Sequence, residues 1–209
     1  MAGMYAVHAT YRGNSLRRAD YVNRFAEALG DAPGTVDSRV HGPEDFAVVA
    51  ADADAAAGVV MNLVQAGDFA VGIGAVAGGD GTADQLIAAA GRAVDGVRRA
   101  GVIQARVEEA GPGGVRAPGR GSEIAGDIAA AFTLVAHVLT RRTAEGREAT
   151  ALVRQGYLQS EAAEIVGISK QAMSQRLAAA GWQAEQAGWN LAVHMLARTE
   201  ALHAADRPE

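Results

Sequence analysis

The chain has 209 residues, of which 49% are hydrophobic, so it holds enough apolar material for two modest domains. A net charge of -5 at pH 7 excludes a protein that coats nucleic acid through a broadly basic surface, so any DNA contact must be local. Because cysteine is absent, disulfides, thiolate chemistry and cysteine metal sites are excluded as well.

The amino-terminal part of the chain alternates strand and helix patterns. Residues 1–11 lack the basic and apolar regions of a secretory signal, and no run of about 18 apolar residues occurs, so we expect a cytoplasmic protein that does not enter a membrane. Two short strands flank the turn residues Gly42 and Pro43, which predicts a hairpin. The expected strands are residues 4–11, 35–40, 46–50, 69–76 and 102–108, and the expected helices are residues 16–29, a segment capped by Asp52 or Asp54 that ends near Gln65, and residues 82–99.

A segment rich in glycine and proline, residues 111–121, separates this part from a helical one. It lacks the apolar mass needed to pack, so we expect a linker there, between an α/β domain at residues 1–110 and a helical domain at residues 122–209. The predicted fold class is therefore α+β. Ser122 is expected to cap a long helix whose apolar residues lie on more than one face, which predicts cover by the other domain or by a partner chain. Its main apolar stripe is Ile124, Ile128, Ala131, Val135 and Leu139, and Phe132, Leu134 and Val138 lie off that stripe.

Residues 144–182 have the pattern of a helix-turn-helix. Ala163 is small, as the crossing of two helices requires, and Gly167 stands where the first helix must end in a left-handed conformation. Ser169 is expected to cap the second helix. The expected core positions are Val166, Ile168, Met173 and Leu177, with Ala149, Leu152 and Val153 contributed by a preceding helix at residues 144–156.

This segment, T-A-E-G-R-E-A-T-A-L-V-R-Q-G-Y-L-Q-S-E-A-A-E-I-V-G-I-S-K-Q-A-M-S-Q-R-L, resembles the helix-turn-helix shared by LuxR-type regulators and sigma-factor region 4. The resemblance implies that the second helix enters the major groove of double-stranded DNA. Glutamine at such positions reads adenine, and lysine contacts guanine or a phosphate. The residues implied to face DNA are Ser169, Lys170, Gln171, Ser174 and Gln175, with Arg176 or Arg154 on the backbone.

The charge of the helix-turn-helix is low for a DNA-binding unit. Residues 139–182 carry six basic side chains against four acidic ones, so one copy is expected to bind weakly and a homodimer to double the contacts. The last helix, about residues 183–203, either forms the dimer seam through Trp189, Val193 and Leu196 or packs on its own domain. A role as an adaptor that binds another protein is the alternative to DNA binding. The basic residues counted are Arg141, Arg142, Arg147, Arg154, Lys170 and Arg176, and the acidic ones are Glu145, Glu148, Glu161 and Glu164.

The order β-α-β-β-α-β-α-β is typical of ferredoxin-like palms, which include nucleotide cyclase-type domains. With M-Y-A-V at the start, G-I-G-A-V-A-G, T-A-D-Q-L-I-A-A-A-G-R-A-V and the terminal helix-turn-helix, the whole chain resembles SatD-type proteins. Cyclase-like palms need a carboxylate in the first strand, where this chain has A-V-H-A-T-Y-R-G-N, and only Glu44 and Asp45 of the hairpin remain. We therefore expect a catalytically silent domain, used for dimerisation, for sensing a small-molecule effector or for both, without a cofactor or a metal.

Residues 78–82 present an alternative. The sequence G-G-D-G-T resembles a loop of diacylglycerol and NAD kinases in which glycines approach phosphates, so a nucleotide-binding enzyme related to kinases or cyclases is the rival hypothesis. The chain lacks the β-rich substrate domain of those kinases, and the simpler interpretation is a turn in which Asp80 caps the next helix. The histidines give no pair at four-residue spacing and predict no metal site; they are His8, His41, His137, His194 and His203.

The function predicted from the sequence is that of a cytoplasmic transcriptional regulator, not an enzyme. Its palm-like domain is expected to dimerise and to present two helix-turn-helix units to DNA.

Overall fold

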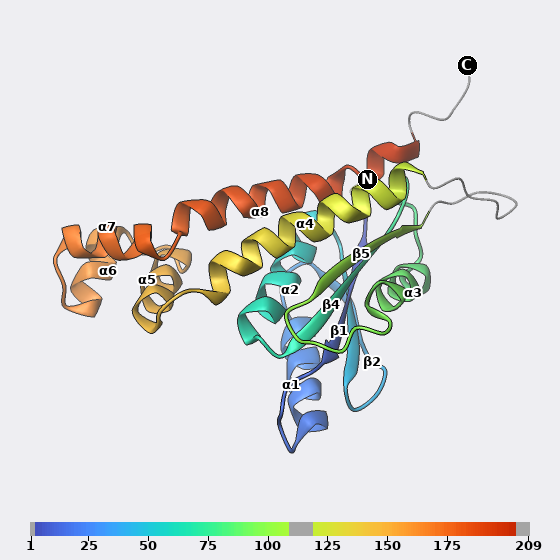
Figure 1. The fold of residues 1–209 in the computed structure, drawn as a ribbon, viewed down its shortest axis with the longest axis horizontal. Coiled ribbons are helices and arrows are strands. Elements are labelled where there is room, and N and C mark those ends of the chain that lie inside the picture. The colour runs from blue at the N-terminus through green and yellow to red at the C-terminus, as the bar shows by residue number, and fades with distance from the viewer. Residues whose placement is uncertain (1–2, 109–118, 204–209) are drawn as a thin grey trace, which may run out of the picture.

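The computed structural model describes residues 3–108 and 119–203, which form a mixed α+β fold built on one five-stranded sheet (Figure 1). The strand order across the sheet is β2-β3-β1-β4-β5. Most of the expected linker, residues 111–118, lies outside the described residues. The strands are β1 (Tyr5–Tyr11), β2 (Thr35–Val40), β3 (Asp45–Ala50), β4 (Phe69–Val76) and β5 (Ile103–Glu108).

The central strand of the sheet is β1. It pairs antiparallel with β3 on one side and with β4 on the other, so that Val7 lies opposite both Val48 and Ile73. The hairpin of β2 and β3 extends the sheet on one side, and β5 adds a parallel strand beside β4 on the other. Each of the five strands expected from the sequence is present, with bounds that differ by one residue or less.

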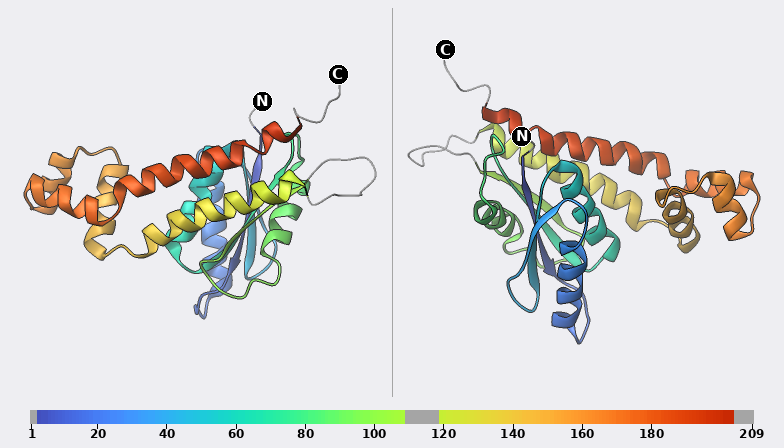
Figure 2. Two further views of the ribbon diagram at one scale, coloured as in Figure 1. Left: turned by 45° about the horizontal axis from the view of Figure 1, so that its top comes forward. Right: turned by 180° about the vertical axis from the view of Figure 1, so that it is seen from behind.

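Helices cover both faces of the sheet (Figure 2). One face is covered by α3, and α1, α2 and α4 cover the other, with α8 packed across α2 and α4. The remaining helices, α5 to α7, lie beyond the ends of α4 and α8 that point away from the sheet (Figures 1 and 2). The helices are α1 (Arg18–Gly30), α2 (Ala53–Ala66), α3 (Ala83–Val94), α4 (Arg120–Thr140), α5 (Ala144–Arg154), α6 (Gln159–Val166), α7 (Lys170–Ala179), α8 (Trp182–Ala197) and the 3-10 helix η1 (Glu200–His203).

Two glycines of β4 bring α3 unusually close to the sheet. A Cβ atom on Gly72 would lie 2.2 Å from the carbonyl oxygen of Ala90, and one on Gly74 would lie 2.3 Å from that of Leu86. Leu86 and Ala90 are fully buried in this contact. Helix α3 therefore rests on the backbone of β4, which a side chain at either glycine would prevent.

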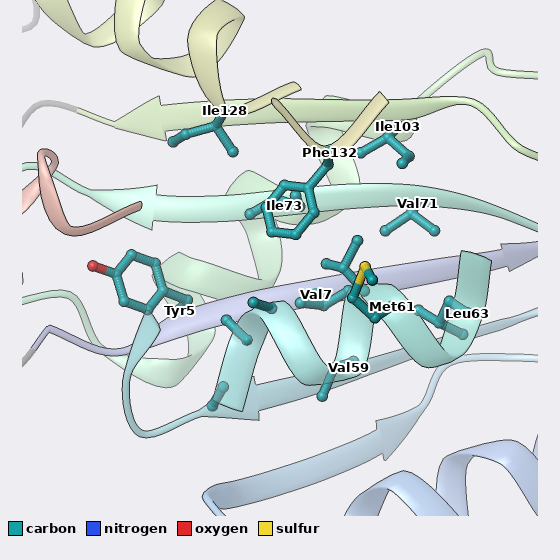
Figure 3. Close-up of a cluster of buried hydrophobic side chains, with 14 of the residues drawn as sticks. Tyr5, Val7, Val59, Met61, Leu63, Val71, Ile73, Ile103, Ile128 and Phe132 are labelled. Carbon is teal, nitrogen blue, oxygen red and sulfur yellow. The ribbon is translucent and has the colours of Figure 1, made fainter. Parts of the chain in front are cut away.

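The main hydrophobic core lies between the opposite face of the sheet and α4. Ile128 and Phe132 of α4 lie over Ile73 and Ile103 of the sheet (Figure 3). By length and hydropathy α4 could cross a membrane, but its apolar stripe is buried against the sheet, as in the core helix of a globular fold. Of the residues off that stripe, Phe132 is buried and Leu134 is 65% exposed.

Helix α8 extends the same core. Ala192 and Leu196 are buried in it, and Trp189 and Val193 pack against it. Within the chain, Trp189, Val193 and Leu196 pack on a core formed by α4 together with α2 and the sheet, and so not on the helical domain alone. The helix ends at Ala197, before the expected residue 203, and a short 3-10 turn follows.

The carboxyl end of α8 and the turn after it form hydrogen bonds with β1 and with the loop after β4. The hydroxyl of Tyr5 donates to the carbonyl oxygen of Leu196 at 3.1 Å, and the backbone N–H of Gly78 donates to the carbonyl oxygen of Thr199 at 3.0 Å. Burial raises the pKa of the Tyr5 phenol far above its ordinary value, so this hydroxyl stays a donor.

Three expected helix ends are corrected. The side chain of Asp52 caps α2 by accepting from Ala55 N–H, as one of the two expectations had it, but Thr82 caps α3 in place of Asp80. Helix α3 stops at Val94, short of residue 99, because Asp95 and Gly96 form a turn in which the N–H of Val97 donates to the carbonyl oxygen of Val94 at 3.1 Å. Helix α4 starts three residues earlier than expected. Its N-cap is Gly119, and Ser122 lies inside the first turn.

We expect Gly74→Ala to destabilise the protein, because the added Cβ collides with the backbone of α3. Overpacking of this kind costs about 1–3 kcal/mol. The matched control is Gly126→Ala on the exposed side of α4, where a Cβ meets nothing within 4 Å and removal of glycine stabilises a helix by about 0.5–1 kcal/mol. Chemical denaturation of both variants measures the difference, and equal free energies of unfolding would contradict the proposed contact.

Candidate nucleic-acid interface

Helices α5, α6 and α7 enclose a small core of their own. Its centre consists of small side chains from α5 and α6 that face two larger ones from α7. The expected core positions are therefore buried or half-buried as predicted. The buried members are Ala149, Ala162, Ala163, Met173 and Leu177, and Leu152, Val153, Val166, Ile168 and Trp182 pack around them.

The turn between α6 and α7 has the geometry that its residues predict. Gly167 ends α6 in the left-handed region, with φ 74 and ψ 33, and the N–H of Ile168 donates to the carbonyl oxygen of Ala163 at 2.9 Å. The hydroxyl of Ser169 accepts from the N–H of Ala172 at 3.1 Å and caps α7. One end of the turn is thus fixed by a backbone hydrogen bond and the other by a side-chain cap.

The outer face of α7 presents the polar residues expected to read bases. Lys170, Gln171, Ser174 and Gln175 are all exposed, and their spacing along the helix places them on one side of it. Helix α7 lies at the end of the molecule farthest from the sheet (Figure 1). Ser169 is exposed at the start of the same face, although its hydroxyl is engaged in the cap.

The two arginines expected on the DNA backbone are both paired with carboxylates. A terminal guanidinium nitrogen of Arg154 lies 2.6 Å from Oε1 of Glu185, and one of Arg176 lies 3.7 Å from Oε2 of Glu148. Arg154 also lies over the ring of Trp182, 5.9 Å from its centroid.

A buried ion pair fixes the helix-turn-helix to the long helices. Arg142, just after α4, and Glu185, in the first turn of α8, are each only 3% exposed and approach to 2.6 Å. Nε of Arg142 donates to the carbonyl oxygen of Ala180, the residue that ends α7, at 2.7 Å. A second nitrogen of Arg142 donates to Thr150 of α5. One guanidinium therefore contacts α5, the end of α7 and the start of α8.

Sequence reasoning did not find this pair, and it counted Arg142 among the surface charges. The two residues are 43 positions apart, so no helical spacing connects them. The three-residue spacing of Trp182 and Glu185 places both on the side of α8 that contacts Arg154 of α5. This spacing could be interpreted only once the structure was known.

The surface charge of the unit is accordingly close to zero. Arg142 and Arg154 share Glu185, which leaves one positive charge, and Arg176 pairs with Glu148 alone. The other charged side chains of residues 139–182 balance, with three basic and three acidic ones: Arg141, Arg147 and Lys170 against Glu145, Glu161 and Glu164.

The hairpin carboxylates are paired with neighbouring side chains. Glu44 is paired with Arg12 and Arg18, and Asp45 accepts a hydrogen bond from the hydroxyl of Thr10 at 2.7 Å and lies 3.3 Å from Nε2 of His8. Within residues 3–108 and 119–203, no group of three or more potential ligands is placed to hold a metal ion. The basic partners of Glu44 occupy the oxygens that a cation would need.

The loop at residues 78–82 uses much of its backbone internally. Gly78 and Gly79 both have positive φ, and their N–H groups donate to the carbonyl oxygens of Thr199 and Val76. The N–H of Thr82 donates to the side chain of Gln85 at 2.9 Å, in a capping box. The backbone N–H groups of Gly78, Gly79 and Thr82 therefore already donate hydrogen bonds within the chain and are not free to bind a phosphate.

We expect Glu185→Ala to destabilise the protein by about 3–5 kcal/mol, because it leaves the buried Arg142 guanidinium without its counter-charge. The matched control is Glu148→Ala, whose carboxylate is 57% exposed and whose ion pair is worth at most about 1 kcal/mol. Urea denaturation of the two variants gives the comparison. A loss at Glu185 no larger than that at Glu148 would show that the buried pair contributes little.

A second prediction concerns pH. Burial lowers the pKa of His8 below its ordinary 6.5, and the contact with Asp45 offsets only part of this effect. Below pH 6.5 His8 binds a proton in the unfolded chain but remains neutral in the folded chain. The free energy of unfolding therefore falls as the pH is lowered from 6.5 to the folded-state pKa of His8.

His8→Gln should remove that component while keeping a polar side chain beside Asp45. The quantity to measure is the difference in unfolding free energy between wild type and variant, at about pH 7.5 and about pH 5.5. We expect this difference to shift in favour of the variant at the lower pH. A difference that does not change with pH would refute the assignment to His8.

Comparison with known proteins gives no relative: no protein-family model, no curated protein and no solved structure matches this chain.

Proposed function

We propose that this protein is a sequence-specific DNA-binding transcriptional regulator that acts in the cytoplasm as a homodimer, through binding and not through catalysis. One observation carries the proposal. Helix α7 presents Lys170, Gln171, Ser174 and Gln175 on an exposed face, while its other face is anchored by Met173 and Leu177 in the small core. A rigid helix with exposed polar side chains near its amino end is what major-groove reading requires.

The resemblance of residues 144–182 to LuxR-type and sigma-region-4 units is part of this proposal. Its support is local. Gly167 has the left-handed conformation, Ser169 caps the second helix, and Ala163 is buried where α6 and α7 meet. These are the positions at which such a motif is constrained.

We further propose that residues 1–110 form a ferredoxin-like palm, as in SatD-type proteins, and that this domain is catalytically silent. The strand order β2-β3-β1-β4 with antiparallel pairing throughout supports the first statement. The pairing of Glu44 with arginines and of Asp45 with Thr10 and His8 supports the second. The packing of α4 on the sheet, and of α8 across α2 and α4, favours grouping these two helices with the palm, and only α5 to α7 with the helix-turn-helix.

The balanced charge of α5 to α7 supports a dimer, since one copy supplies few phosphate contacts. The same balance, with three exposed apolar residues on or next to α6, favours a second candidate function, that of an adaptor that binds another protein. These residues are Tyr157, Leu158 and Ile165.

The test is selection of DNA duplexes from a random library by the wild type, followed by titration of the enriched duplex. We expect the double variant Lys170→Ala, Gln171→Ala to bind at least about tenfold more weakly, because each base-reading contact contributes about 1–3 kcal/mol. The control is Asn190→Ala, His194→Ala, which removes two exposed side chains from α8 and should leave affinity unchanged. Equal binding by wild type and α7 variant would reject α7 as the reading helix, and failure of the wild type to enrich any duplex would leave the adaptor role.

A further inference from the structure

Glu185 is shared by two guanidinium groups. Its Oε2 lies 2.6 Å from a nitrogen of Arg142, and its Oε1 lies 2.6 Å from a nitrogen of Arg154. The two arginines come from opposite ends of α5: Arg142 precedes this helix, and Arg154 is its last residue.

The charges of this cluster do not cancel. Two guanidinium groups against one carboxylate leave one positive charge in excess. Arg142 is 3% exposed and must stay paired, because an isolated buried charge is costly. Arg154 is 39% exposed, so the excess charge lies where it can meet an anion.

Arg154 is also held in one orientation. Glu185 fixes one end of its planar guanidinium, and the ring of Trp182 lies under it. An arginine fixed in this way has already lost much of its side-chain entropy, so it binds a phosphate at lower cost than a free side chain does. Arg176 differs, because it faces its own carboxylate, Glu148, and that pair has no excess charge.

We propose that Arg154 contacts a phosphate of the DNA backbone and that Glu185 is the residue that positions it. Arg176 is not a phosphate contact. The choice between the two arginines, which the sequence leaves open, follows from whether the carboxylate is shared: Arg154 shares Glu185 with Arg142, whereas Arg176 has Glu148 to itself. This inference rests on the proposed DNA-binding function and names one of its contacts.

The experiment measures affinity for a labelled mixed-sequence DNA duplex over a range of salt concentrations, because phosphate contacts do not depend on base sequence. Each phosphate contact contributes about 0.9 to the slope of log affinity against log salt. We expect Arg154→Gln to reduce that slope by about 0.9 for each bound copy of the chain. The matched control, Arg176→Gln, should leave the slope unchanged. Both variants keep the buried pair of Arg142 and Glu185, so both should stay folded.

A third variant tests the positioning. Arg154→Lys keeps the charge but lacks the planar group that Glu185 and Trp182 hold. We expect it to retain the wild-type slope and to bind several-fold more weakly than wild type. Full affinity in Arg154→Lys would overturn the positioning role of Glu185.

The outcomes separate this inference from the function on which it rests. If the wild type binds the duplex and Arg154→Gln has an unchanged slope, the phosphate contact is wrong and the DNA-binding function survives. If the slope falls equally for Arg154→Gln and Arg176→Gln, the argument from excess charge is wrong. If the wild type binds no duplex even at low salt, the proposed function itself fails.

Discussion

The antiparallel pairing of α4 and α8 is the constraint on which the arrangement of the molecule depends. The two helices approach closely at Gly188, where a Cβ atom would lie 2.4 Å from Val135. At one end they share the core of the sheet, through residues such as Phe132 and Leu196. At the other end the buried ion pair of Arg142 and Glu185 ties them to the helix-turn-helix. The two long helices therefore connect the sheet to the helix-turn-helix (Figure 2).

Local features of the fold were predictable because they depend on local chemistry. The alternation of strand and helix patterns gave the five strands, and glycine and serine chemistry gave the turn at Gly167 and the cap at Ser169. The exposed face of α7 follows from the same pattern, because Met173 and Leu177 define the buried side. These predictions need only residues within one or two helical turns of each other.

The remaining features depend on contacts between distant segments, which spacing cannot reveal. From the sequence alone Arg142 is counted as a surface charge, because nothing indicates that it is buried beside Glu185. The apolar side of α8 is equally compatible with a dimer seam and with its own domain, and in the structure it packs across α2 and α4, on the core that these helices share with the sheet. The predicted amino ends of α3 and α4 were wrong for a more local reason. Ser122 and Asp80 are good capping residues that stand near the true caps, Gly119 and Thr82, and composition alone does not choose among neighbours.

Under the proposed function, the sheet-based domain would bring two copies together, and α4 and α8 would set the distance between the two reading helices. The chain has no cysteine, so Lys170→Cys offers one unique labelling position in each copy. The most direct measurement is the distance between spin labels at this position, with the rest of the sequence unchanged, by pulsed electron paramagnetic resonance. We expect a single narrow distribution centred near the helical repeat of DNA, about 34 Å, after allowance for the label linker. The absence of any intermolecular distance, or a broad distribution without that spacing, would contradict a dimer built to read DNA.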